Sequence, residues 1–205
     1  MRRVARELGA GTMSLYHYLR TKDDLLALMD DALMGELLVP DGELPAGWRE
    51  ALTAIARRTR DAWARHPWAH DAMGGSRLGP NGMKHIEQSL AAVASIGLDP
   101  VDRLRVIGMV DDYVIGFCVR DVAVRATVDE SAGPGAGGLD PLLDYVAERL
   151  ETGEYPETKG LVGDGDVRAT WGRLASQAFG ADRFEQGLAR LLDGIELDLE
   201  RRRGG

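Results

Sequence analysis

A short stretch near the amino terminus contains side chains that can form hydrogen bonds in the groove of a polar partner molecule. The stretch contains Thr12, Met13, Ser14, Tyr16, His17 and Tyr18. Hydroxyl, imidazole and phenol groups donate and accept hydrogen bonds, which is the chemistry that reads base edges in a major groove about 12 Å wide. Lys22 follows and suits a contact with phosphate. The alternative is that Tyr16 and Tyr18 are only packing residues.

Two short helices are needed to present these side chains. Gly9 predicts the end of a helix over residues 2–8, and Gly11 precedes a second helix expected over residues 12–18. The residues expected to face inward are Val4, Ala5, Leu8, Leu15 and Leu19. Because Ala5 is small, the two helices can cross closely. The pattern therefore predicts a helix-turn-helix whose second helix points its polar side chains outward.

The charge of the chain is unevenly distributed. The whole chain carries −8 at pH 7, yet residues 1–22 hold five basic residues against one acidic residue, so they carry +4 and the remainder carries −12. A basic end on an acidic body would orient that end toward a duplex and neutralise phosphates there. The alternative is that the basic residues form an ordinary solvated helix face.

Elsewhere the apolar spacing is helical, which predicts an all-α protein. Thr21 and Asp24 have the spacing of a capping box and start a third helix. The breaker-rich residues 39–47 then separate a DNA-binding unit over 1–38 from a larger domain over 46–202. In that domain, helices are expected from Trp48 to His66, from Ile86 through Val93 to Ile96, and over 100–128, 140–151, 166–179 and 182–200.

The segments that connect the expected helices are rich in glycine or in acidic residues. Residues 74–82 and 130–138 are glycine-rich and are expected to be loops, as is the acidic stretch 152–165. The chain is expected to end in an exposed basic tail, Arg201-Arg202-Arg203-Gly204-Gly205.

Aromatic and methionine side chains of the larger domain could line an apolar ligand pocket. The candidates are Trp63, Trp68, Met73, Met109, Tyr113, Phe117 and Trp171. The alternative for each of them is a plain core position.

Several classes of site are disfavoured by the sequence. No nucleophile elbow, phosphate loop or supported carboxylate pair occurs, so an enzyme is not expected. Adjacent Asp111 and Asp112 point in different directions on a helix, which suggests one interface residue and one solvated residue. Pro67 interrupts the helix that His66 and His70 would need to share a metal, so neither a metal nor another cofactor is expected.

Cysteine content and hydropathy indicate the compartment. The single cysteine, Cys118, is expected to be a small buried residue. No apolar run approaches the roughly 20 residues that span a bilayer, so a cytoplasmic protein without membrane contact is expected.

The amino-terminal stretch resembles the TetR family of bacterial repressors. The resemblance rests on Leu8-Gly9, Leu15-Tyr16, the pair His17-Tyr18, and Lys22 before Asp24-Leu25-Leu26. It implies that the DNA-binding residues are Arg2, Arg3, Thr12, Met13, Ser14, Tyr16, His17, Tyr18 and Lys22. Arg2 is suited to a guanine edge, and Tyr16 and His17 to phosphates or a thymine methyl group.

Beyond residue 45 the resemblance is one of architecture, supported by the closing run from Phe184 to Arg202. It implies a repressor that leaves a double-stranded operator when a small hydrophobic or amphipathic effector binds inside the larger domain. It also implies a homodimer built through helices 100–128 and 182–200. The residues expected at that interface are Leu188, Leu191, Leu192 and Ile195.

The family begins with a helix that precedes the pair found here, and Met1 lies within the position of the family's second helix. Either an upstream start or a shortened paralogue is expected. The alternative function is therefore a truncated dimeric module that binds a small molecule without autonomous DNA binding.

Overall fold

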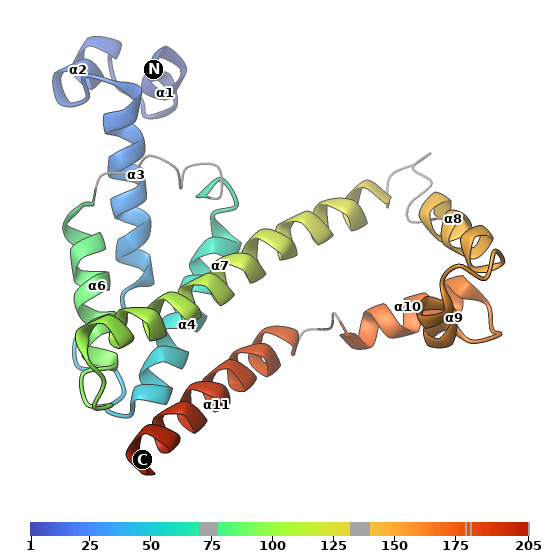
Figure 1. The fold of residues 1–205 in the computed structure, drawn as a ribbon. Helices are drawn as coiled ribbons and strands as arrows, with labels where there is room; N and C mark the ends of the chain where they lie inside the picture. The colour runs from blue at the N-terminus through green and yellow to red at the C-terminus, as the bar shows by residue number, and fades with distance from the viewer. Residues whose placement is uncertain (70–77, 132–139, 179, 181, 205) are drawn as a thin grey trace. The chain divides into compact units, whose positions relative to one another are not determined.

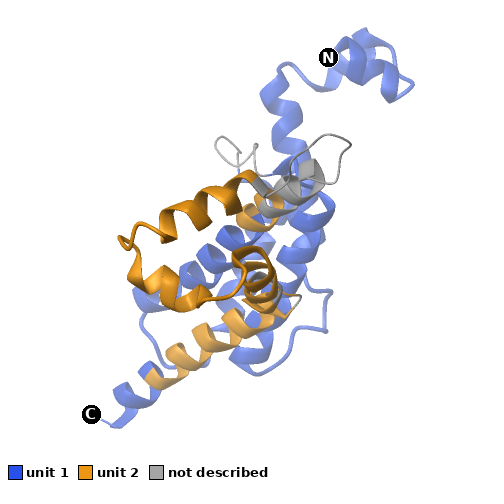
Figure 2. Cartoon of the chain, turned by 90° about the vertical axis from the view of Figure 1, so that its right-hand side faces the viewer, with its two compact units in different colours: residues 1–118, 198–205 blue, residues 119–197 orange. Residues whose placement is uncertain are grey.

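The computed structural model describes residues 1–69, 78–131, 140–178, 180 and 182–204, and every regular element within them is a helix (Figure 1). The all-α prediction is thereby confirmed. The chain forms two compact units, residues 1–118 with 198–205 and residues 119–197 (Figure 2). Within the part of the chain that is described, no helix combines the length and apolar character needed to cross a membrane.

The helix-turn-helix prediction is confirmed in its boundaries. Helix α1 covers Arg2–Glu7 and helix α2 covers Thr12–Tyr18. Gly9 lies between them with φ of 63°, a left-handed conformation that glycine adopts without strain. Ala5 and Leu19 are buried as expected. Leu8 is not, with 64% of its surface exposed, because it lies past the last residue of α1, where the chain turns toward Gly9 and leaves the inner face.

The third helix begins at the predicted capping box. Helix α3 covers Lys22–Leu37, and the backbone N–H of Asp24 donates to Thr21 Oγ1 at 3.0 Å. In return, Asp24 Oδ2 accepts from the backbone N–H of Thr21 at 3.0 Å. These two bonds satisfy donors that the first turn of a helix leaves unpaired, so they fix where α3 starts.

Helices α4, Trp48–Arg65, and α6, Pro80–Ala92, pack against α3 and against each other within the first unit. The predicted spacing on α4 is confirmed, because Leu52, Ile55, Thr59 and Trp63 are buried. The prediction for α6 was wrong at both ends. At its carboxy-terminal end, Val93 and Ile96 lie beyond the helix, although both are buried in the turn that follows. At its amino-terminal end, the helix starts inside the glycine-rich stretch, because Pro80 suits the first turn of a helix.

Two long helices belong partly to each unit. Helix α7 covers Pro100–Ser131, and Asp99 Oδ1 caps it by accepting from the backbone N–H of Asp102 at 2.9 Å. Helix α11 covers Arg183–Gly204, so the basic tail is exposed as expected and continues the helix as far as Gly204. The reason is that Arg202 bonds Asp102 and also Asp198, the latter at 2.8 Å, which holds the last turn in place. Cys118 is buried, as expected.

The second unit also contains α8, Asp140–Leu150, α9, Pro156–Val162, and α10, Val167–Ala178. Helix α9 was missed, because its seven residues are too few to show a period and it lies in the stretch expected to be a loop. The expected loop 130–138 lies mostly outside the described residues.

Candidate DNA-reading surface and effector cavity

Helix α2 lies at the amino-terminal end of α3 in the first unit (Figure 1). Its outer face exposes large side chains. Met13 and Tyr18 have 83% and 82% of their surface exposed, and Tyr16 has 45%. Ser14 and His17 are also exposed, whereas Thr12 is partly covered. An exposed cluster of large side chains marks an interaction surface more often than a fold requirement. Tyr18 is therefore not a packing residue of this chain.

Basic side chains flank this face. Arg2 and Arg3 are exposed on α1, and Lys22 is exposed at the first residue of α3. The amino-terminal end of a helix carries a partial positive charge, which adds to the ammonium group of Lys22. The arrangement is suited to phosphate groups, because exposed cations on α1 and α3 accompany exposed hydrogen-bonding side chains on α2.

Helix α3 joins this face to the packed part of the first unit, and polar contacts hold it there. Asp31 Oδ1 accepts from the backbone N–H groups of Asn81 at 2.8 Å and Gly82 at 3.2 Å. The side-chain amide of Asn81 donates to the backbone carbonyl of Asp31 at 3.0 Å. We call this set the Asp31 clamp. It satisfies unpaired donors at the start of α6 and ties that helix to the middle of α3.

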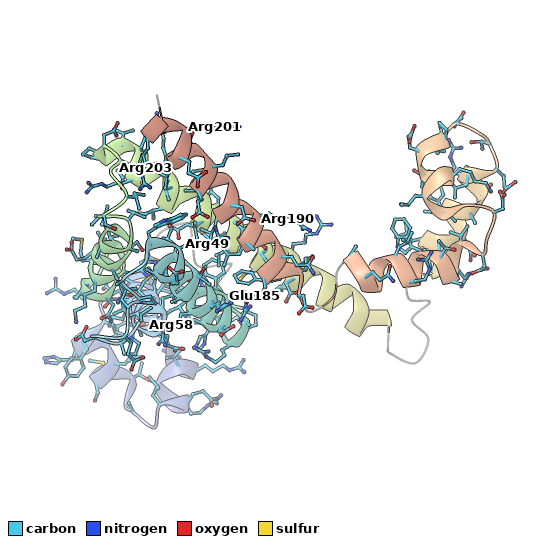
Figure 3. All side chains as sticks on the ribbon, turned by 90° about the horizontal axis from the view of Figure 1, so that it is seen from below. Arg49, Arg58, Glu185, Arg190, Arg201 and Arg203 are labelled. Carbon is cyan, nitrogen blue, oxygen red and sulfur yellow. The ribbon has the colours of Figure 1, made fainter. Side chains whose placement is uncertain are left out.

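Further polar contacts hold the carboxy-terminal end of α3 and the residues that follow it. Glu36 bonds Arg65 Nη2 and His66 Nε2, each at 2.9 Å, and these hydrogen bonds hold the pKa of Glu36 below its ordinary value. The guanidinium of Arg58, which lies on α4 (Figure 3), donates to the backbone carbonyl of Glu36 at 3.2 Å. Gln88 on α6 bonds both backbone groups of Val39. His66 thus bonds Glu36, whereas His70 lies outside the described residues. The described part of the chain contains no cluster suited to a metal.

A cavity of about 240 Å³ lies among α3, α4 and α6 and the segments that flank residues 70–77. Its apolar lining comprises Leu33, Met34, Trp63, Ala69, Leu78 and Ile86. Its polar side chains are Asp30 and His85, and Gly79 and Gly82 complete the wall. Burial lowers the pKa of His85, which favours a neutral imidazole.

Of the predicted ligand-binding residues that the structure describes, Trp63 alone lines this cavity. Trp68 and Met109 are exposed, while Tyr113 and Phe117 lie next to each other on α7 with ring centroids 6.4 Å apart. Trp171 is partly buried in the second unit, and Met73 lies outside the described residues. A role for these residues in ligand binding stays a prediction.

Asp30 and His85 were missed by the sequence analysis. A usable signal existed on α6, where Gly82, His85, Ser89 and Ala92 follow each other at intervals of three or four. Polar residues at core-facing positions of a helix are uncommon without a partner or a function.

The predicted dimer residues lie on α11. Leu188, Leu192 and Ile195 are buried within the single chain, and Leu191 is partly buried. Their part in a dimer stays a prediction. On α7, Asp112 is exposed as expected for the solvated residue, and Asp111 is partly buried within the single chain, so its place at an interface stays a prediction. Burial, followed by the charge of Asp112, raises the pKa of Asp111 to about 6.

Comparison with known proteins gives consistent results. A family model described as "Tetracyclin repressor-like, C-terminal domain" matches residues 40–199. The HTH-type transcriptional repressor DrrR1 of Streptomyces coeruleorubidus is 36% identical over all of this chain and 72% of its own length. An HTH-type transcriptional regulator of Saccharopolyspora erythraea is 38% identical over 78% of this chain and 64% of its own length.

Solved structures agree with the relatives. The TetR family protein ActR of Streptomyces coelicolor, in complex with actinorhodin, superposes with a TM-score of 0.65 at 25% identity, over 97% of this chain and 87% of ActR. A possible TetR family regulator of the same species superposes with a TM-score of 0.61 at 26% identity, over 96% of this chain and 88% of that one. Together with its helix-turn-helix and all-helical fold, these matches show that the chain belongs to the TetR family of transcriptional regulators.

Proposed function

We propose that this protein is a cytoplasmic repressor that binds an operator as a homodimer and leaves it when a small molecule enters the cavity of the first unit. One observation carries the proposal. Helix α3 bears the α1–α2 pair at its amino-terminal end, and its middle supplies Asp30, Leu33 and Met34 to the cavity wall. A molecule in the cavity therefore touches the same rigid element that aims the DNA-reading side chains.

The exposed face of α2 is the part proposed to enter the major groove. Tyr16, His17 and Ser14 offer hydrogen bonds to base edges and phosphates, and Met13 offers an apolar contact to a thymine methyl group. Arg2, Arg3 and Lys22 supply phosphate or guanine contacts at the edges of that face. A local basic end makes this compatible with the net charge of −8.

Release follows from a population shift. An effector that binds better to a position of α3 unsuited to the operator draws the protein toward that position, and a coupling of about 1–3 kcal/mol is typical of such systems. We expect the shift to change the Asp31 clamp most directly, because the clamp adjoins the cavity. Gly79 and Gly82 line the cavity, and Asp31 bonds Asn81 and Gly82. The relative DrrR1 is named a repressor, and ActR was solved with actinorhodin, which supports the same assignment here.

Electrophoretic retardation of the DNA upstream of the chain's own gene tests the proposal. The full chain is expected to retard that DNA in the presence of non-specific competitor. Tyr16→Ala and Lys22→Ala are expected to weaken binding by about tenfold, the scale of one base or phosphate contact. Tyr145→Ala and Lys84→Ala, which remove exposed residues of the same types elsewhere, serve as controls. Absence of retardation, or equal binding by Tyr16→Ala and Tyr145→Ala, contradicts the proposal.

A second candidate is a dimeric small-molecule-binding module without autonomous DNA binding. It is favoured by the small number of buried residues in the α1–α2 pair, since Ala5 and Leu19 are the only buried residues among 1–21. Amide hydrogen exchange of the free protein separates the candidates. Exchange of α1 and α2 at the rate of an unfolded chain supports the module, and measurable protection of Ala5 and Leu19 supports the repressor.

A further inference from the structure

The segment between α2 and α3 carries an arginine whose side chain has no partner. Arg20 is exposed, and its guanidinium makes no hydrogen bond or ion pair with any atom of the described residues. Many arginines elsewhere in the chain do bond carboxylates: Arg60, Arg65, Arg105, Arg149, Arg168, Arg183 and Arg202. The guanidinium of Arg20 is therefore available to an anion outside the chain.

The backbone of Arg20 is held in place, although its side chain is not. Its N–H donates to Asp24 Oδ2 at 3.1 Å, and the N–H of Thr21 donates to the same oxygen at 3.0 Å. The preceding residue, Leu19, is buried. The main chain from which the guanidinium extends is thus fixed on one side by a buried residue and on the other by the start of α3.

A second cation lies close to Arg20. Lys22 is exposed and, like Arg20, forms no ion pair with a described residue. Thr21, between them, has extended backbone angles, and an extended chain places residues two apart at about 6.5–7 Å. Both side chains are long, so they can reach the same phosphate group or two neighbouring ones. Asp23 is exposed as well, but successive helical residues do not face the same way.

The position of Arg20 relative to α2 indicates which part of DNA it meets. It follows Tyr18, the last residue of α2, by two residues, so it lies just past the end of the helix proposed to enter the groove. A groove is bordered by sugar-phosphate backbone, so a cation beyond the end of an inserted helix meets phosphate rather than base edges. The planar guanidinium suits this partner, because it can donate two parallel hydrogen bonds to one phosphate.

We propose that Arg20 contacts a phosphate of the operator through its guanidinium, beside Lys22. This rests on the proposed function in taking α2 as the helix that enters the major groove. The contact adds affinity and fixes the orientation of α2 on the duplex, but it adds no preference for sequence, because every nucleotide carries a phosphate.

The salt dependence of DNA binding tests this, because each phosphate contact releases bound counterions. The full chain is titrated into a fluorescent duplex of the DNA upstream of its own gene, at several salt concentrations between roughly 50 and 200 mM, and anisotropy gives the binding constant K. The slope of log K against log salt concentration has a magnitude of about 0.9 per phosphate contacted. Arg20→Gln should lower that magnitude by about 0.9 per subunit, or about 1.8 for a homodimer.

Two further variants separate a phosphate contact from a general effect of charge. Arg20→Lys keeps the charge but loses the paired bonds of the guanidinium, so it should keep the slope of the parent chain and lose part of the affinity. Arg190→Gln removes an exposed arginine of α11 (Figure 3) that also has no partner among the described residues. It changes the net charge equally and should leave both the slope and the affinity close to those of the parent chain.

A random-sequence duplex of the same length supplies a second readout. Arg20→Gln should weaken binding to the upstream DNA and to the random duplex by the same factor, about tenfold. Tyr16→Ala, which removes a group proposed to read bases, should weaken binding to the upstream DNA more than to the random duplex. Arg20→Gln should melt at the temperature of the parent chain, because it changes an exposed side chain and keeps the backbone bond to Asp24. Should this variant unfold, Arg20→Met removes the same charge and takes its place.

The outcomes also distinguish this inference from the proposed function. An unchanged slope in Arg20→Gln, a change equalled by Arg190→Gln, a slope lost in Arg20→Lys, or a loss confined to the upstream DNA overturns the inference alone. Equal binding of both duplexes by the parent chain, with a slope that Arg20→Gln lowers, keeps the phosphate contact and removes the assignment as an operator-binding repressor. A chain that binds neither duplex loses both.

Discussion

The two ends of α3 meet very different surroundings. At its amino-terminal end, the α1–α2 pair buries little of its own surface and exposes Met13, Tyr16 and Tyr18. Farther along, α3 packs between α4 and α6, with Leu33 and Leu37 buried and with Asp31 and Glu36 held by hydrogen bonds. The difference indicates that the packed part sets the position of α3, while the exposed part uses its side chains on a partner.

The largest effect should separate core from surface. Leu52→Ala empties space around a side chain that is 1% exposed, and should lower the free energy of unfolding by about 2–5 kcal/mol. Met13→Ala removes a side chain that touches little, and should change it by less than about 0.5 kcal/mol. Urea denaturation followed by circular dichroism measures both. Similar losses in the two variants would remove the contrast between the two ends of α3.

Loss of the Asp31 clamp should have the second largest effect on the free energy of unfolding. Asp31→Ala leaves the backbone N–H groups of Asn81 and Gly82 without their acceptor, and should lower the free energy of unfolding by about 1–3 kcal/mol. The same change should speed amide exchange at the first turn of α6. Asp41→Ala, an exposed residue of the same type, is the control. Unchanged exchange at Asn81 and Gly82 would show that the clamp does not hold α6 to α3.

Asp111 gives a pH-dependent effect within the packed unit. Its pKa of about 6 in the folded chain exceeds the ordinary value of about 3.9, so the folded state binds this proton more tightly than the unfolded state. The contribution of Asp111 to stability therefore falls as the pH rises from about 4 to 6, and stays low above 6. Asp111→Asn should raise the free energy of unfolding by about 1–2 kcal/mol at pH 8, after allowance for partial exposure, and by little at pH 4.

Thermal melts of the parent chain, Asp111→Asn and Asp112→Asn at pH 4 and pH 8 measure this effect. Asp112 is exposed, and its variant should gain less at pH 8. A gain for Asp111→Asn that is the same at both pH values would contradict the raised pKa.

The smallest expected effect concerns the exposed contacts of Glu36, near the carboxy-terminal end of α3, with Arg65 and His66. The pKa of Glu36 is lowered by hydrogen bonds from Arg65 and His66, so its stabilising contribution is present above its ordinary pKa and is lost as the pH falls through the lowered value. Glu36→Gln should lower the melting temperature slightly at pH 7 and lose that difference in acid. The pair is solvent-exposed, so high salt should also reduce the difference. A larger effect than that of Asp31→Ala would reverse the order of the two contacts.

The amino-terminal part could be predicted from the sequence because its determinants are local. Gly9, with its left-handed backbone, follows the end of α1. Thr21 and Asp24, three residues apart, form the capping box that starts α3, so each boundary is fixed by residues next to it. Exposure of the α2 face followed from the same pattern. Leu8 was the exception, since its position depends on how the chain leaves α1 rather than on its apolar type.

The cavity and the clamp could not be predicted in this way. Asp31 and Asn81 lie 50 residues apart, and no periodicity reports a hydrogen bond between them. Similarly, the sequence analysis did not single out His85, because the cavity beside it is formed with α3 and α4, which lie far from it in the sequence. Only the polar residues at core-facing positions of α6 carried a hint, because such positions are normally apolar.

Amide hydrogen exchange with and without the upstream DNA tests the central claim most directly. If α2 enters the major groove, exchange of residues 12–18 and of Lys22 should slow when that DNA is bound, while exchange in α8 to α10 stays the same. Protection confined to other helices, with α2 unchanged by DNA, would contradict the assignment of α2 as the reading helix and with it the proposed function.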